Sequence, residues 1–276
     1  MPYLTVGEEN SDAIDVYFED HGFGRPVVLI HGYPLSGTAW EKQVPVLLDQ
    51  GYRVITYDRR GFGRSSQPAT GYEYDTFAAD LNMLMSALDV RDAVLVGHSM
   101  GTGEVTRYLS SYGSARVDRA VFVAPLMPYL LKTTDNPDGV DGTLFDGIMQ
   151  NIKTDRYAYL AMFLTQFYNR GMRGARPVSD ELYRANWYVA AGASPIGTLA
   201  CVTAWLTDFR ADLAAIDVPS LIVQGDADQI LPYEATGKRF HEKMPGSRLV
   251  CLSNAPHGLP WTHADELNHE LLTFMK

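Results

Sequence analysis

The chain has little cysteine, no long apolar run and a deficit of positive charge. Its two cysteines, Cys201 and Cys251, are too few for a disulfide framework and too isolated for a thiolate metal site. We expect both to be small buried side chains. No run of about 18 apolar residues is present that could span a bilayer. The net charge of −10 is dispersed, which disfavours nucleic acid or an anionic membrane as a partner.

The first residues also lack the features of a secretory signal peptide. Residues 1–9 contain neither the basic stretch nor the apolar stretch that such peptides carry. We therefore expect a cytoplasmic protein. The apolar content of 46% and the charged content of 20% are typical of a globular chain, and 276 residues are enough to bury one large core.

Short β-branched runs alternate with longer amphipathic stretches over most of the chain. The runs that we predict to be strands buried on both faces are 26–30, 53–57, 93–96, 119–123, 220–223 and 248–252. Helical periodicity is present in the stretches 38–50, 75–89, 100–112, 233–244 and 262–275. This alternation predicts a doubly wound α/β fold with a mostly parallel sheet.

The alternation stops between about residues 126 and 216. No convincing strand pattern is present there, and helical segments are expected at 155–169, 179–191 and 195–206. We therefore divide the chain into a core domain, 1–125 and 217–276, and an inserted helical cap, 126–216. The aromatic side chains of the cap could line a substrate pocket or form ordinary packed core, and the pattern leaves both open.

A serine lies where a predicted strand turns into a predicted helix. The sequence Gly97-His98-Ser99-Met100-Gly101 matches the G-x-S-x-G pattern of a nucleophile elbow. A sharp turn at this point holds the serine side chain away from the backbone, and the flanking glycines avoid collisions that a Cβ would make. Because so short a pattern also arises by chance, its weight depends on the side chains that lie at the ends of the other strands.

Ligands of an open parallel sheet bind at the carboxyl ends of its strands, and reactive side chains come after two later predicted strands. Asp226 and Asp228 come after 220–223, and His257 comes after 248–252. We predict that Ser99 is a nucleophile, that His257 takes its proton and that Asp228 orients the imidazole. Asp226 competes for the last role, but it is more typical of a structural turn.

Attack on a carbonyl creates an oxyanion, which preorganised backbone N–H groups stabilise best. Met100, directly after the serine, is expected to donate one N–H, and Tyr33, in the loop after 26–30, the second. Pro34 has no N–H, but it fixes the backbone beyond Tyr33.

Two other features carry residue types that occur in binding sites. The glycine-rich stretch from Asp58 to Ser65 lacks the spacing of a dinucleotide or phosphate loop, so we expect a turn held by Asp58 and the neighbouring arginines. The remaining histidines show no metal-ligand spacing, and we expect no metal and no cofactor.

Taken together, these motifs resemble the α/β-hydrolase superfamily, and within it the cofactor-free (non-heme) haloperoxidases or perhydrolases, aryl esterases and γ-lactamases. The resemblance covers nearly the whole chain and implies the triad Ser99, Asp228 and His257, with the oxyanion hole at Tyr33 and Met100. Many haloperoxidase-type members carry Trp in place of Tyr33, whereas Tyr followed by Pro is more similar to the γ-lactamase branch. A proline after this aromatic residue is associated with perhydrolysis, in which hydrogen peroxide attacks the acyl-enzyme.

We therefore expect a serine hydrolase that acts through an acyl-enzyme on small esters or lactams, with perhydrolase side activity. Its partners would be a small acyl substrate and hydrogen peroxide. The sequence leaves open whether the chain forms a homo-oligomer. The alternatives are a non-catalytic ligand-binding protein of the same fold and a hydrolase of another small carbonyl substrate. A dehalogenase or epoxide hydrolase would need a carboxylate in place of the elbow serine. The residues expected to line the substrate pocket are Pro34, Leu126, Phe163, Trp205 and Leu259.

Overall fold

The computed structural model describes residues 2–276. An eight-stranded sheet forms its centre, in the spatial order β1-β2-β4-β3-β5-β6-β7-β8. All pairs of neighbouring strands from β3 to β8 are parallel. These six strands correspond to the six strands predicted from the sequence. Their bounds are β3 Pro26–Ile30, β4 Arg53–Tyr57, β5 Ala93–His98, β6 Val117–Val123, β7 Ser220–Gly225 and β8 Arg248–Leu252.

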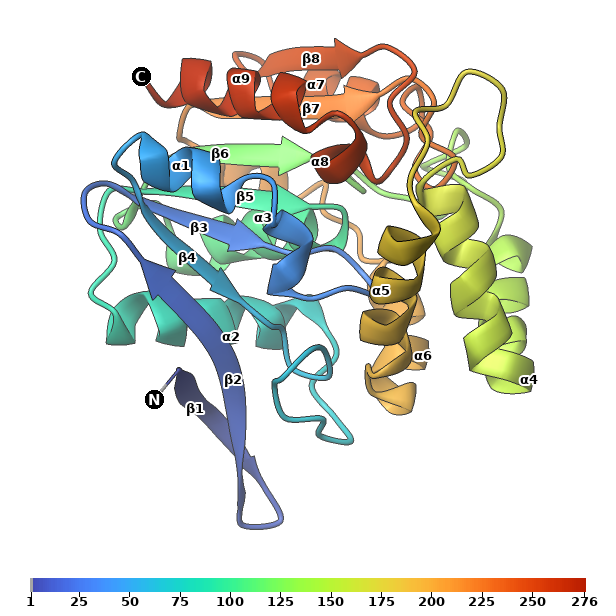
Figure 1. Cartoon of the computed structure of the whole chain (residues 1–276), viewed down its shortest axis with the longest axis horizontal. Helices are drawn as coiled ribbons and strands as arrows, with labels where there is room; N and C mark the ends of the chain where they lie inside the picture. Colours follow the sequence, from blue (N-terminus) through green and yellow to red (C-terminus); the bar gives the residue numbers. More distant parts are fainter. Residues whose placement is uncertain (1) are drawn as a thin grey trace.

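Helices cover both faces of the sheet, as the alternation of the sequence predicted (Figure 1). Adjacent residues of β3 point to opposite faces, so Val28 and Ile30 pack in the core of one face and Val27 and Leu29 in that of the other. The first core includes side chains of α2 (Tyr74–Ala87), α3 (Met100–Tyr112) and α7 (Gly237–Lys243). The second includes those of α1 (Val44–Asp49), α8 (Leu259–Thr262) and α9 (Ala264–Met275).

The two antiparallel strands at one edge of the sheet were not predicted. β1 (Tyr3–Glu9) and β2 (Asp12–His21) form a hairpin that reaches away from the rest of the molecule (Figure 1). Its turn is made by Asn10 and Ser11, both at positive φ, as two-residue hairpin turns require. Most of the hairpin's side chains are exposed or half-buried. The alternation of apolar and polar residues around Ile14 and Val16 is a strand signal, but it is too short to predict a strand.

Three helices from the stretch 126–216 lie beyond the carboxyl ends of the parallel strands (Figure 1). They are α4 (Gly142–Phe167), α5 (Asp180–Ala191) and α6 (Pro195–Ala204). α4 begins earlier than predicted, and Asp155, with φ −155° and ψ 92°, interrupts it, so the expected segment corresponds to its second half. The division of the chain into core and cap stays a prediction.

The two cysteines differ in exposure. Cys201 is buried in α6, whereas Cys251 is exposed on β8. The expectation that both are buried was therefore wrong for Cys251, because β8 is an edge strand. In the part of the chain that the structure describes, no helix is both long enough and apolar enough to cross a membrane.

Candidate active site

Ser99 occupies a strained turn between β5 and α3. Its φ of 53° and ψ of −120° lie in a region that non-glycine residues rarely adopt. The flanking glycines allow the turn: a Cβ on Gly97 would lie 2.5 Å from the carbonyl oxygen of Gly101, and a Cβ on Gly101 would lie 2.5 Å from that of Ile30. The local geometry is therefore that of a nucleophile elbow.

Three side chains from separate strand ends meet at this turn. The Oγ of Ser99 lies 2.8 Å from Nε2 of His257, and Nδ1 of the same ring lies 2.7 Å from Oδ2 of Asp228. The exposed fractions are 7% for Ser99, 0% for His257 and 4% for Asp228. A buried Ser-His-Asp line of this kind allows the imidazole to accept the serine proton while the carboxylate holds the ring.

The two aspartates after β7 have different surroundings. The Oδ1 of Asp228 accepts hydrogen bonds from the backbone N–H groups of Ile230 and Leu231, both at 2.8 Å, which leaves its other oxygen for His257. Asp226 is exposed, and its Oδ1 accepts a hydrogen bond from the backbone N–H of Asn254 at 2.6 Å. The structure thus brings Asp228 to His257 and ties Asp226 to the backbone of Asn254.

The two expected oxyanion donors come from different elements: Tyr33 lies in the loop after β3, and Met100 is the first residue of α3, directly after Ser99. Within residues 2–276 neither N–H donates a hydrogen bond to a backbone acceptor outside the regular elements, so both can bind an incoming oxyanion. The loop before Tyr33 packs directly on the serine, since a Cβ on Gly32 would lie 3.0 Å from the Cβ of Ser99.

A cavity of about 480 Å³ opens over Ser99. Tyr33 and Met100 line it, as do three of the predicted pocket residues, Leu126, Phe163 and Trp205. The side chains that surround this cavity carry no charge; the polar ones, besides Ser99 and Tyr33, are Thr143, Asn151, Tyr159, Gln166, Trp205, Gln229 and Thr236.

The other two predicted pocket residues do not line this cavity. Pro34 is buried but absent from the lining. Leu259, two residues after His257, begins α8. Its side chain is fully buried in the hydrophobic core with Leu267 and Leu271 of α9. The prediction that Leu259 lines the pocket was based on its closeness to His257 in the sequence. It was wrong because the backbone turns into α8 directly after His257.

The aromatic residues of the stretch 126–216 take both of the roles left open by the sequence. Tyr159, Phe163 and Trp205 line the cavity, and Phe167 packs in the hydrophobic core. Tyr188 takes neither role, because it is exposed. Phe167 packs edge-on against the ring of His257, with centroids 5.1 Å apart. Sequence reasoning missed that contact, because nothing local indicates which turn of α4 reaches the histidine.

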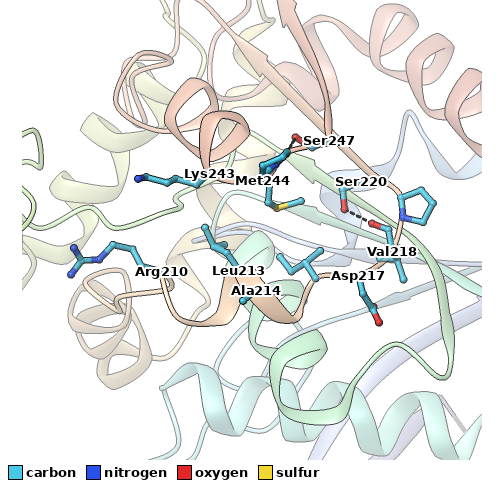
Figure 2. A pocket seen from close by; sticks show the side chains of 13 residues that line it. Arg210, Leu213, Ala214, Asp217, Val218, Ser220, Lys243, Met244 and Ser247 are labelled. Carbon is cyan, nitrogen blue, oxygen red and sulfur yellow. Dashed lines mark hydrogen bonds between the residues drawn. The ribbon is translucent and has the colours of Figure 1, made fainter.

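A second hollow, of about 690 Å³, lies at the opposite end of the sheet. Figure 2 shows its lining, which includes Val218 before β7, Ser220 at the start of β7, and Met244 and Ser247 before β8. None of the residues that meet at Ser99 contributes to it. Despite its larger volume we place the candidate active site in the cavity over Ser99, where the reactive side chains lie.

The site combines an elbow serine with an aspartate and a histidine, all at the strand ends of a doubly wound sheet and in the chain order Ser, Asp, His. This combination defines a serine hydrolase. Among residues 2–276, no group of three or more His, Cys, Asp or Glu side chains is arranged to hold a metal ion.

The chain belongs to the α/β-hydrolase fold family, whose model matches residues 25–264. It is 59% identical, over the full length of both chains, to a Synechocystis protein provisionally named a non-heme chloroperoxidase. A bifunctional esterase/perhydrolase of Acinetobacter calcoaceticus is 35% identical, also over the full length of both chains. The crystal structure of a bromoperoxidase from Bacillus anthracis superposes with a TM-score of 0.95, at 49% identity, over 99% of this chain and 98% of the other. Within the family the chain therefore falls in the non-heme haloperoxidase group.

Proposed function

We propose that this protein hydrolyses small esters or lactams through an acyl-enzyme on Ser99, and that hydrogen peroxide can replace water as the second nucleophile. The observation that carries the proposal is the pair of contacts made by His257, at 2.8 Å to Ser99 and 2.7 Å to Asp228, beside an uncharged cavity.

In the first half of the reaction, Oγ of Ser99 forms a bond to the substrate carbonyl carbon while its proton passes to Nε2 of His257. The carbonyl π electrons move onto oxygen, and the N–H groups of Tyr33 and Met100 donate to this oxyanion. When the carbonyl re-forms, the bond to the leaving alcohol or amine breaks, and the leaving group takes the proton from His257. Asp228 stabilises the imidazolium throughout.

In the second half, His257 takes a proton from water or from hydrogen peroxide, and the resulting nucleophile attacks the acyl carbon. Release of Ser99 yields a carboxylic acid with water and a peracid with peroxide. A peracid can transfer its distal oxygen to a halide, which gives hypohalite and the acid. The names of the relatives, an esterase/perhydrolase and haloperoxidases, and the Tyr33-Pro34 pair support the peroxide route.

A fluorophosphonate probe tests the nucleophile. We expect stoichiometric phosphonylation of Ser99 in the native protein and none in the Ser99→Ala variant or after denaturation. A substrate panel of p-nitrophenyl esters, a bicyclic γ-lactam, and acetate with hydrogen peroxide then separates the branches. Absence of both labelling and turnover would favour the non-catalytic ligand-binding alternative.

A further inference from the structure

A buried ion pair lies beneath the proposed oxyanion hole. Arg59 lies just beyond the end of β4, and Glu104 is on α3, one helical turn after Met100. The exposed fractions of the side chains are 1% and 0%, and Nε of Arg59 donates to Oε2 of Glu104 at 2.7 Å. Neither residue lines the cavity over Ser99. A pair buried this deeply contributes little net stability, because desolvation offsets most of the attraction, so its other contacts are informative.

The hydroxyl of Tyr57 donates to the other carboxylate oxygen of Glu104, and the remaining contacts of Arg59 converge on His31, the last residue before the oxyanion loop. The Nη2 group of Arg59 donates to the backbone carbonyl oxygen of His31 at 2.9 Å. The backbone N–H of Arg59 donates to Nε2 of the same histidine at 3.0 Å. Arg59 therefore holds both the main chain and the ring of His31.

The ring of His31 passes this constraint on to the next peptide unit. Since Nε2 accepts a hydrogen bond, Nδ1 carries the proton, and it donates to the carbonyl oxygen of Gly32 at 2.9 Å. Burial, and then the charge of Arg59, keep the pKa of His31 well below its ordinary range, so the ring remains neutral. The backbone N–H of Leu35 donates to the same carbonyl oxygen at 3.2 Å.

The direction of the Tyr33 N–H is set by the Gly32 carbonyl. The two groups belong to one planar trans peptide, in which the N–H points opposite to the C=O. Holding the oxygen on one side therefore aims the N–H to the other side. At the same time Glu104 connects Arg59 to α3, the helix whose first residue, Met100, supplies the second donor.

We infer that Arg59 and Glu104 are positioning residues for the reaction: through His31 they orient the Gly32–Tyr33 peptide and set the two oxyanion donors relative to each other. The inference rests on the proposed function, because it requires the Tyr33 N–H to bind the oxyanion. An oxyanion hole stabilises a transition state only when its donors are held in place beforehand, so this pair acts on kcat rather than on substrate binding.

The chain offers a matched control in the next residue. Arg60 makes a two-point ion pair with Asp80, both contacts at 2.6 Å, and the two residues are 6% and 3% exposed. This second buried pair shows no hydrogen bond to His31, Gly32 or Tyr33 in the described part of the chain.

The test compares the double variants Arg59→Met/Glu104→Gln and Arg60→Met/Asp80→Asn. Each removes a buried ion pair without leaving an unpaired charge. For the first we expect kcat for p-nitrophenyl acetate to fall about tenfold to a hundredfold, below the roughly 10²- to 10³-fold cost of losing a donor outright, with KM within about threefold. Inhibition by phenylboronic acid, whose serine adduct is tetrahedral, should weaken by a similar factor. For the second we expect kcat and inhibition near those of the wild type.

If the two double variants lower kcat equally, the Arg59 pair is merely structural. The same conclusion follows if kcat falls in the first variant while inhibition by phenylboronic acid is not weakened. If the first double variant does not fold, Arg59→Lys decides by the same criteria. Lysine can pair with Glu104, but all its donors are on one nitrogen, whereas Arg59 reaches Glu104 and the His31 carbonyl from two separate nitrogens. Ser99→Ala separates the two hypotheses: an active Ser99→Ala enzyme overturns the proposed function, whereas an inactive one beside a fully active Arg59 variant overturns only this inference.

Discussion

The ring of His98 donates a hydrogen bond from Nε2 to the backbone carbonyl oxygen of His257, at 3.0 Å. Since His98 directly precedes Ser99, one short segment presents the serine and also holds the main chain of the histidine that faces it. The ring centroids of His98 and His257 lie 5.1 Å apart. Burial, and then the nearby His257, lower the pKa of His98 to about 3, so the ring of His98 is neutral at neutral pH.

The low pKa of His98 predicts acid sensitivity of the fold. The unfolded chain binds a proton at this histidine below its ordinary pKa of 6.5, whereas the folded protein does so only near about 3. The stabilisation is thus complete above about pH 6.5 and decreases as the pH falls toward 3, by up to about 1.4 kcal/mol per pH unit. Urea denaturation at several pH values in this window measures the slope.

His98→Gln should reduce that slope, because glutamine keeps a side-chain donor for the His257 carbonyl but does not titrate. His21→Gln is the control, since His21 is exposed on the hairpin. Equal pH slopes for His98→Gln and the wild type would contradict the prediction.

The two aspartates after β7 predict opposite outcomes for the same substitution. Asp228→Asn should lower kcat about 10⁴-fold, as loss of the orienting carboxylate does in a serine protease, because it removes the charge that faces Nδ1 of His257. Asp226→Asn keeps the oxygen that accepts from Asn254 and should leave kcat within about threefold. Steady-state hydrolysis of p-nitrophenyl acetate measures both, and a large loss in Asp226→Asn alone would reverse the assignment.

The uncharged lining of the cavity predicts discrimination against charged acyl groups. A carboxylate in this cavity would lose water without gaining an ion pair. We expect kcat/KM for p-nitrophenyl butyrate to exceed that for p-nitrophenyl hemisuccinate, of similar length, on the order of 10²-fold. Comparable values for the two esters would mean that a charged group outside the cavity over Ser99 meets the acyl chain.

Pro34 predicts a change in the choice of second nucleophile. It is buried beside Tyr33 but does not line the cavity, so its effect must pass through the backbone, where the ring restricts φ and removes an N–H. Pro34→Ala should lower the ratio of perhydrolysis to hydrolysis by about threefold or more, measured as peracid and acid formed from one ester in the presence of hydrogen peroxide. An unchanged ratio would remove Pro34 from the account of perhydrolysis.

Much of the fold could be read from local pattern. The six parallel strands were predicted because runs such as 26–30 and 53–57 are short, apolar and rich in β-branched residues. The expected burial on both faces was wrong for 248–252, because β8 is an edge strand whose side chains are mostly exposed or half-buried. The hairpin of β1 and β2 was missed because most of its side chains are exposed or half-buried. The start of α4 was missed because a break at Asp155 separates the first half of the helix from the predicted segment.

The sequence by itself determined the strand-helix alternation and the elbow around Ser99, since both depend on residues close together in the chain. It also determined the chain order of serine, aspartate and histidine, which needs no knowledge of their contacts. Only the tertiary structure decided which aspartate meets His257, which aromatic side chains line the cavity, and that Arg59 and Glu104 join the oxyanion loop to α3. Those contacts connect residues far apart in the chain, and their distances depend on strand order and side-chain packing, which local periodicity does not encode.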